Sequence, residues 1–223
     1  HVKCYNTQEA AYEFYHSKAG ENHWVKSAEL VPMQHALEMG EWDIITLQQV
    51  SGLSGKYESY VPHLDRLIAI VSKAQPQAEL VWHMTWSYAK ESTHGDFPKY
   101  DRDQQKMYDA ITDCVHRMLK EHDCFEKIIP SGTAIQSLRL SEINNSPKDF
   151  TRDGYHMDLG AGRYALACTW YETLIKPYTR LSMMGNSLRL DLGDVKVTDT
   201  TAPYCQKAAK KAARKPFKVQ RIK

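Results

Sequence analysis

Apolar residues recur along this chain at the three- and four-residue spacing of a helix face, broken by short continuous apolar runs. The helical spacing predicts helices over five segments, residues 7–18, 28–39, 60–74, 101–121 and 159–175. In the fourth segment, Met107, Ile111 and Met118 share one face, and we expect Asp101 to cap the start of the helix.

Three continuous apolar runs are short and rich in Ile, Val and Leu, which is typical of buried strands. They cover residues 42–49, 78–86 and 125–132. Strands that alternate with helices predict an α/β fold with a parallel sheet, and a chain of 223 residues fits a single domain over residues 1–223. Three strands are few for this much helix, so we expect further strands upstream of His1.

The overall charge pattern favours no polyanionic partner. The formal net charge is +2, and the one basic concentration, residues 207–223, has the spacing of a solvent-exposed terminal helix. We therefore expect no nucleic-acid partner. No apolar run is long enough to span a bilayer, and five scattered cysteines imply no disulfide framework.

A G-x-G-x-x-A run at residues 160–165 imitates the fingerprint of a dinucleotide site. Such a site needs a strand directly before the run and an acidic residue about 20 positions later, and neither is found here. Ala161, Ala165 and Cys168 instead form a small-residue helix stripe, which we expect to pack closely on the sheet. The sequence therefore predicts no nucleotide cofactor, and it predicts no metal site.

Asp153 and His156 carry the clearest candidate chemistry. A carboxylate three positions before a histidine on a turn can accept a hydrogen bond from Nδ1, which leaves Nε2 free as a general base. The same spacing also occurs in ordinary surface turns. The chain has no G-x-S-x-G nucleophile motif, and Ser51 and Ser54 follow a predicted strand without that glycine spacing.

The chain resembles the SGNH (GDSL-type) hydrolase superfamily, and within it a bacterial branch of unknown function. The similar segments are WDIITLQQVSG (42–52), HMTWSYA (83–89), IIPSGTAIQ (128–136) and TRDGYHMDLGAGRYALACTWYE (151–172). With the C-terminal part they span nearly the whole chain, and together they are much more specific than any one of them.

This resemblance implies a flavodoxin-like three-layer α/β/α sandwich and a serine esterase that deacylates carbohydrates. It gives Asp153 the role of orienting acid and His156 that of general base, with the nucleophilic serine upstream of residue 1. Gln48 or Gln49 would stabilise the oxyanion, and only one of them can serve because neighbouring strand residues face opposite ways. Ser187, in a Gly-Asn-Ser sequence, would serve as nucleophile only after a circular permutation.

The expected partner is a carbohydrate or other small ester, and Trp86, Tyr88 and Tyr155 are candidates to contact it. These aromatic side chains are as well explained by loop packing. The resemblance suggests a periplasmic or secreted protein, with the cytoplasm as the alternative, and the sequence does not indicate an oligomeric state. A carbohydrate-binding protein without catalysis is the second hypothesis, and a metal-assisted hydrolase using His83, His156 and Asp158 is the third.

Overall fold

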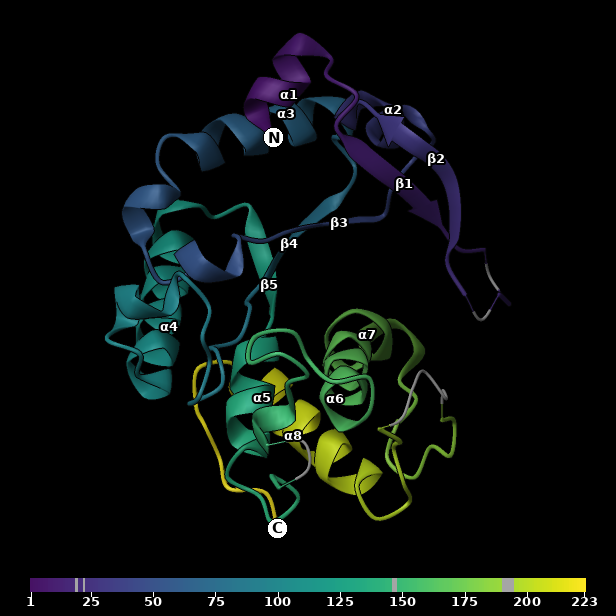
Figure 1. The fold of residues 1–223 in the computed structure, drawn as a ribbon. Coiled ribbons are helices and arrows are strands. Elements are labelled where there is room, and N and C mark those ends of the chain that lie inside the picture. The colour runs from purple at the N-terminus through teal and green to yellow at the C-terminus, as the bar shows by residue number, and fades with distance from the viewer. Residues whose placement is uncertain (19, 22, 146–147, 190–194) are drawn as a thin grey trace. The chain divides into compact units, whose positions relative to one another are not determined.

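The chain divides into two compact units in a computed structural model that describes residues 1–18, 20–21, 23–145, 148–189 and 195–223. The first unit comprises residues 1–45 and 58–79, and the second comprises residues 46–57 and 80–223. Their helices and strands are labelled in Figure 1.

An antiparallel hairpin and three helices form the first unit. Strands β1 (Tyr12–His16) and β2 (Val25–Val31) pair from Tyr12 opposite Val31 to His16 opposite Val25. The helices are α1 (Val2–Thr7), α2 (Met33–Glu38) and α3 (His63–Ala74). Buried Gln75, after α3, accepts from the Trp42 amide at 3.1 Å and donates to the Gly40 carbonyl at 2.9 Å, and so ties α3 to the chain after α2.

The predicted helix over residues 7–18 is wrong, and the one over 28–39 is confirmed only in its second half, as α2, because the hairpin forms over the rest. Aromatic side chains of β1, such as Tyr12 and Phe14, favour a pleated strand, and pairing with β2 outweighs the helix-like spacing. Pro32 ends β2 and caps α2 with extended backbone. A proline at that point is incompatible with a helix running through it.

The second unit is built on a three-stranded parallel sheet flanked by helices, in a mixed α/β fold. Its strands are β3 (Ile44–Leu47), β4 (Glu79–His83) and β5 (Phe125–Ile129), in the order β3-β4-β5. Strand β4 pairs with β5 in parallel from Leu80 opposite Phe125 to His83 opposite Ile129. All three predicted strands are confirmed, and the unit boundary crosses β3 and the start of β4.

Three helices of the second unit lie where helices are predicted: α4 (Gln104–Glu121), α6 (Ala161–Trp170) and α8 (Ala202–Arg214). Two more, α5 (Ser131–Leu138) and α7 (Lys176–Thr179), are not predicted, and a π-helical turn η5 (Tyr171–Ile175) lies between α6 and α7. Short 3-10 turns are η1 (Ser51–Leu53), η2 (Tyr57–Ser59), η3 (Phe97–Tyr100) and η4 (Lys148–Phe150). The predicted cap Asp101 is wrong, because Asp101 adopts φ 56° to end η3, and Asp103 caps α4 instead.

Small residues allow α6 and α8 to pack closely (Figure 1). Ala161 and Ala165 of α6 share a buried cluster with Cys205 and Ala208 of α8. We expected the small-residue stripe of α6 to pack on the sheet. That expectation is wrong, because the alanine face of α8 packs against the stripe. The predicted helix over the basic residues 207–223 is confirmed only as far as Arg214, where α8 ends, and one face of α8 is buried rather than solvent-exposed.

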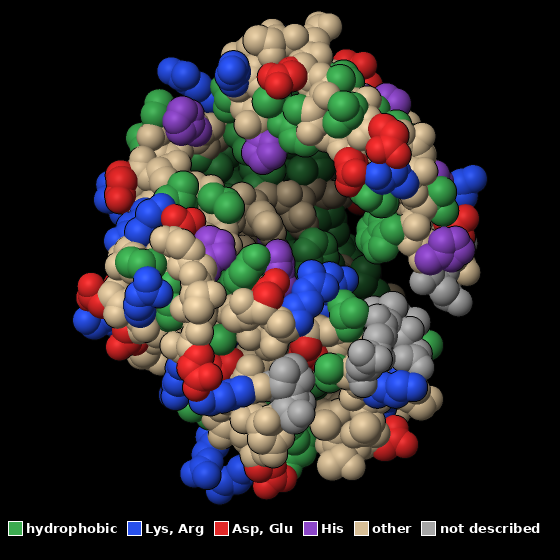
Figure 2. Space-filling view, in the orientation of Figure 1, with side chains coloured by type: hydrophobic (Ala, Val, Ile, Leu, Met, Phe, Trp, Pro, Cys, Tyr) green, Lys and Arg blue, Asp and Glu red, His purple; other side chains and the backbone are tan. Residues whose placement is uncertain are grey.

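Charged side chains of both signs are interspersed over the face drawn in Figure 2. The helices within the described ranges include none with the length and apolar character needed to cross a bilayer.

We expect Ala208→Leu to destabilise the second unit by about 1–3 kcal/mol, because Ala208 has no exposed surface and the added carbons overpack the helix interface. Lys207→Leu, on the exposed face of α8, is the matched control and should change stability little. Urea unfolding of both variants measures the difference. Equal unfolding midpoints would contradict this packing.

Candidate active site

A tight hairpin of residues 150–158 carries the candidate catalytic pair. Thr151 and Met157 form an antiparallel bridge. The amide of Asp158 donates to the Phe150 carbonyl at 2.8 Å, and the amide of Arg152 donates to the His156 carbonyl at 3.0 Å. Residues 153–156 therefore form the tip of this hairpin, directly before α6.

Asp153 and His156 make the hydrogen bond that their spacing predicts. His156 Nδ1 lies 2.6 Å from Asp153 Oδ2. The other carboxylate oxygen, Oδ1, accepts the backbone amides of His156 at 2.7 Å and Tyr155 at 3.1 Å. The imidazole side chain is 53% exposed, and no described residue is hydrogen-bonded to its Nε2. The ring is therefore oriented through Nδ1 while Nε2 stays open to a ligand.

The surroundings of Asp153 keep its carboxylate ionised. Partial burial acts to raise its pKa, but hydrogen bonds from the His156 ring and from the amides of His156 and Tyr155 outweigh burial and lower the pKa below its ordinary value. At neutral pH the carboxylate accepts only, so Nδ1 of His156 carries a proton and Nε2 of the neutral ring is the basic nitrogen.

The segment after β4 holds the hairpin tip from outside. The amide of Ala89 donates to the Gly154 carbonyl at 2.8 Å, and Trp86 Nε1 donates to the Tyr155 carbonyl at 2.8 Å. Gly154 has φ +89°, and a Cβ there would lie 3.0 Å from Ser92 Cα. The position needs glycine both for its backbone angle and for this close approach, which the sequence analysis missed.

The three predicted aromatic contacts lie in different environments. Tyr88 is fully buried, and its hydroxyl lies 3.1 Å from Ser51 Oγ, so its ring packs inside the second unit. Trp86 and Tyr155 are partly buried. The Tyr155 ring lies between His94, at a centroid distance of 4.6 Å, and His156, at 4.3 Å. Tyr155 is thus the aromatic side chain in contact with the candidate base.

Two buried charged residues, Arg139 and Asp149, support the base of the hairpin. Arg139, just after α5, donates to Ser87 Oγ at 2.9 Å and to the Ser87 carbonyl at 3.0 Å. Asp149 Oδ2 accepts from the Lys90 amide and from Gln104 Nε2, each at 3.0 Å. Burial lowers the pKa of Arg139 to about 10, so the guanidinium stays charged at neutral pH. Neither residue stands in a recognisable motif.

The two candidate oxyanion residues differ in their contacts. Gln48 Oε1 lies 2.6 Å from His83 Nδ1, and His83 Nε2 lies 2.9 Å from Ser131 Oγ. Gln49 Oε1 accepts the amide of Val50 at 2.8 Å. His83, buried at the end of β4, is a second site residue that the sequence analysis did not connect to Gln48. Burial lowers its pKa to about 4.

The serines considered as nucleophiles lie in other hydrogen-bonded positions. Ser51 contacts the Tyr88 hydroxyl, and Ser54 donates to the Ser51 carbonyl at 2.7 Å. Ser187 follows Gly185 in an exposed segment, and within the described ranges none of the three is hydrogen-bonded to His156.

The residues considered for a metal do not come together. His83 is engaged by Gln48 and Ser131, and Asp158 accepts the amides of Gly160 at 2.7 Å and Gly162 at 3.0 Å at the start of α6. Among the residues that the structure describes, no group of three or more His, Cys, Asp or Glu side chains is placed to hold a metal ion.

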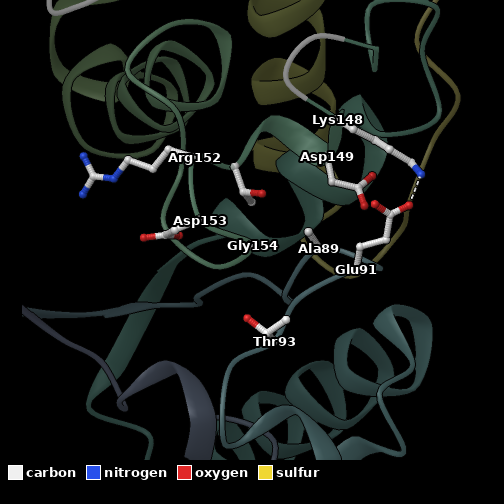
Figure 3. Close-up of a pocket in the computed structure, with 9 residues that line it drawn as sticks. Ala89, Glu91, Thr93, Lys148, Asp149, Arg152, Asp153 and Gly154 are labelled. Atoms are coloured by element: carbon white, nitrogen blue, oxygen red, sulfur yellow. Dashed lines mark hydrogen bonds and ion pairs between the residues drawn. The ribbon is translucent and has the colours of Figure 1, made fainter.

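A polar pocket of about 240 Å³ adjoins Asp153 (Figure 3). Its lining consists of Ala89, Glu91, Thr93, Lys148, Asp149, Thr151, Arg152, Asp153 and Gly154. Lys148 reaches Glu91 in a close ion pair, while the Arg152 side chain extends the opposite way. The threonine hydroxyls and charged side chains of the pocket offer hydrogen-bond donors and acceptors.

Gly154→Ala should destabilise the hairpin tip, because the added Cβ meets Ser92 and the positive φ is unfavourable for alanine by about 1–2 kcal/mol. Gly95→Ala is the matched control, since nothing lies within 4 Å of a Cβ built there. Thermal unfolding measures both variants. An unchanged midpoint for Gly154→Ala would show that the tip relaxes freely.

Protonation of His83 should destabilise the fold in mild acid. The folded pKa of about 4 lies below the ordinary value of 6.5, so the unfolded chain binds a proton first as the pH falls. Stability that is complete above about pH 6.5 should therefore be lost progressively down to about pH 4. Urea unfolding across this range should show a steeper loss for the wild type than for His83→Asn, and parallel curves would contradict a neutral buried His83.

The comparisons with known proteins agree on the family. Residues 1–212 match the model of the domain of unknown function DUF4886. The crystal structure of a DUF4886 family protein from Bacteroides uniformis ATCC 8492 is similar at 34% identity and a TM-score of 0.84, over 100% of this chain and 82% of that one. No curated protein matches. With this family model over most of its length and this solved relative, the chain belongs to the DUF4886 family.

Proposed function

We propose that this chain carries the acid and base of an SGNH-type serine esterase that removes acyl groups from a carbohydrate. The observation that carries the proposal is the 2.6 Å hydrogen bond from His156 Nδ1 to Asp153 Oδ2. It orients an exposed imidazole whose Nε2 is open, which is the arrangement that a serine nucleophile needs.

In the proposed first step, a serine hydroxyl attacks the ester carbonyl carbon as His156 Nε2 takes the hydroxyl proton. The carbon–oxygen bond of the leaving group then breaks, and the imidazolium gives its proton to the departing sugar oxygen. Asp153 stabilises the imidazolium through the Nδ1 hydrogen bond. Its own lowered pKa keeps it charged during this step.

In the second step, water replaces the sugar. His156 takes a proton from the water as the water attacks the acyl-serine, and returns it to the serine oxygen as the carboxylic acid leaves. Resemblance to the superfamily supports a nucleophile N-terminal to residue 1, on a first strand of a flavodoxin-like α/β/α sandwich, and it also supports export from the cell.

The polar pocket beside Asp153 supports a hydroxylated substrate. Its lining combines the Thr93 and Thr151 hydroxyls with charged side chains. The Tyr155 ring, against His156, is placed to contact the face of a sugar that approaches the base.

His156→Ala in the full-length protein should lower kcat/KM for acetylated sugars by at least about 10³-fold, because the variant lacks the imidazole that Asp153 orients. Acetate release from a peracetylated monosaccharide measures the effect. His63→Ala is the control, since this exposed histidine lies in the first unit, at the start of α3.

Unimpaired hydrolysis by His156→Ala would refute the esterase proposal. Saturable sugar binding without acetate release by the wild type would instead favour the non-catalytic carbohydrate-binding protein.

Asp153→Asn should fold normally yet lower kcat by about 10²–10⁴-fold, because the amide can hold His156 in the wrong tautomer. Because backbone amides also hold Oδ1, circular dichroism should show an unchanged fold. An unchanged kcat would mean that His156 needs no orienting acid.

A further inference from the structure

Three polar side chains form a continuous hydrogen-bonded chain along the carboxyl ends of the parallel strands. Gln48 follows β3, His83 ends β4, and Ser131 comes two residues after β5. The distances are 2.6 Å from Gln48 Oε1 to His83 Nδ1 and 2.9 Å from His83 Nε2 to Ser131 Oγ. This is the sheet edge where open α/β folds bind ligands.

The need to satisfy every buried hydrogen-bonding group determines which atom donates at each step of this hydrogen-bonded chain. Ser131 has no exposed surface, and among described residues its hydroxyl has only His83 as a side-chain partner. If His83 donated to Ser131, the serine proton would need another acceptor, and a buried unsatisfied donor costs about 1–3 kcal/mol. Ser131 therefore donates to Nε2, and Nδ1–H of the neutral ring donates to Gln48 Oε1.

The Gln48 end of this hydrogen-bonded chain presents a hydrogen-bond donor with a fixed direction. With Oε1 held by His83, the amide nitrogen of Gln48 faces away from the buried ring, and Gln48 is an exposed residue. An oxyanion needs such a preorganised donor, since a freely rotating amide would have to be ordered in the transition state.

We propose that His83, itself held by Ser131, is the positioning residue that fixes the amide nitrogen of Gln48 as an oxyanion donor. The inference rests on the proposed esterase function and assigns Gln48, rather than Gln49, to the oxyanion. Trp86 links these three side chains to the candidate pair: its ring centroid lies 6.4 Å from that of His83, and its Nε1 donates to the carbonyl of Tyr155, next to His156.

A double-mutant cycle on ester hydrolysis by the full-length protein tests this coupling. Gln48→Ala should lower kcat by about 10²–10³-fold with KM unchanged. His83→Ala should lower kcat by at least about 10-fold, again with KM unchanged. In the Gln48→Ala background, His83→Ala should cost no more than about twofold further, because its effect acts through Gln48.

Additive losses in the double variant would overturn the proposal, since they would give His83 a merely structural role. Full kcat in Gln48→Ala would overturn it as well. Gln49→Ala is the matched control and should retain kcat within about threefold of the wild type. His83→Asn should restore most of kcat, because its amide can still donate to Gln48, and this variant serves if His83→Ala does not fold.

The outcomes separate this inference from the esterase proposal. If the wild type hydrolyses esters and His156→Ala does not, while both Gln48→Ala and His83→Ala retain full kcat, only the oxyanion assignment fails. If neither the wild type nor His156→Ala differs from buffer, the esterase proposal fails. Nitrogen-15 NMR then still tests the chain: a proton on His83 Nδ1 agrees with it, and a proton on Nε2 overturns it.

Discussion

The guanidinium of Arg139 and the carboxylate of Asp149 fix the candidate site, because both are buried and both must find partners. Asp149 and Phe150 adopt φ 57°, a left-handed conformation that costs roughly 1–2 kcal/mol per residue. Bonds to Asp149 from Lys90, Gln104 and Asn144 offset that cost. These bonds favour the backbone conformation with which the chain enters the 150–158 hairpin.

This constraint connects two segments that are distant in sequence. Arg139 donates to Ser87 in the segment after β4, and that segment then reaches the hairpin tip through Trp86 and Ala89. The tip is thus held at its base and along its side. Such double support favours one orientation of His156, even though more than half of its side chain is in contact with solvent.

Regular periodicity made much of the fold predictable. Long apolar stripes predicted helices where the structure has α3 and α4, and short β-branched runs predicted the strands β3, β4 and β5. The N-terminal hairpin was missed because Ala11, Tyr12 and Tyr15 have the spacing of a helix face, and the pairing with β2 that makes this segment a strand is not visible locally. Pro32 was a visible signal that should have broken the second predicted helix.

The candidate site, like the fold, was predictable from the sequence only in part. Asp153 and His156 are three residues apart, so their contact could be predicted from spacing alone. Gln48, His83 and Ser131 are 35 and 48 residues apart, and only the parallel sheet brings them together. Gly154 could have been recognised as a turn glycine from its place between the two, but its contact with Ser92 depends on a segment more than fifty residues earlier.

The geometry of the Asp153–His156 pair also has a bearing on how this family diverges. Each hydrogen bond to Asp153 comes from a residue two or three positions away, so insertions elsewhere in the chain move the acid and base together without altering their mutual geometry. A relative whose other strands have changed can therefore keep an intact Asp–His turn for as long as its hairpin folds. In such a relative the turn alone shows common ancestry, and only residues on other strands can show whether the proposed chemistry is possible.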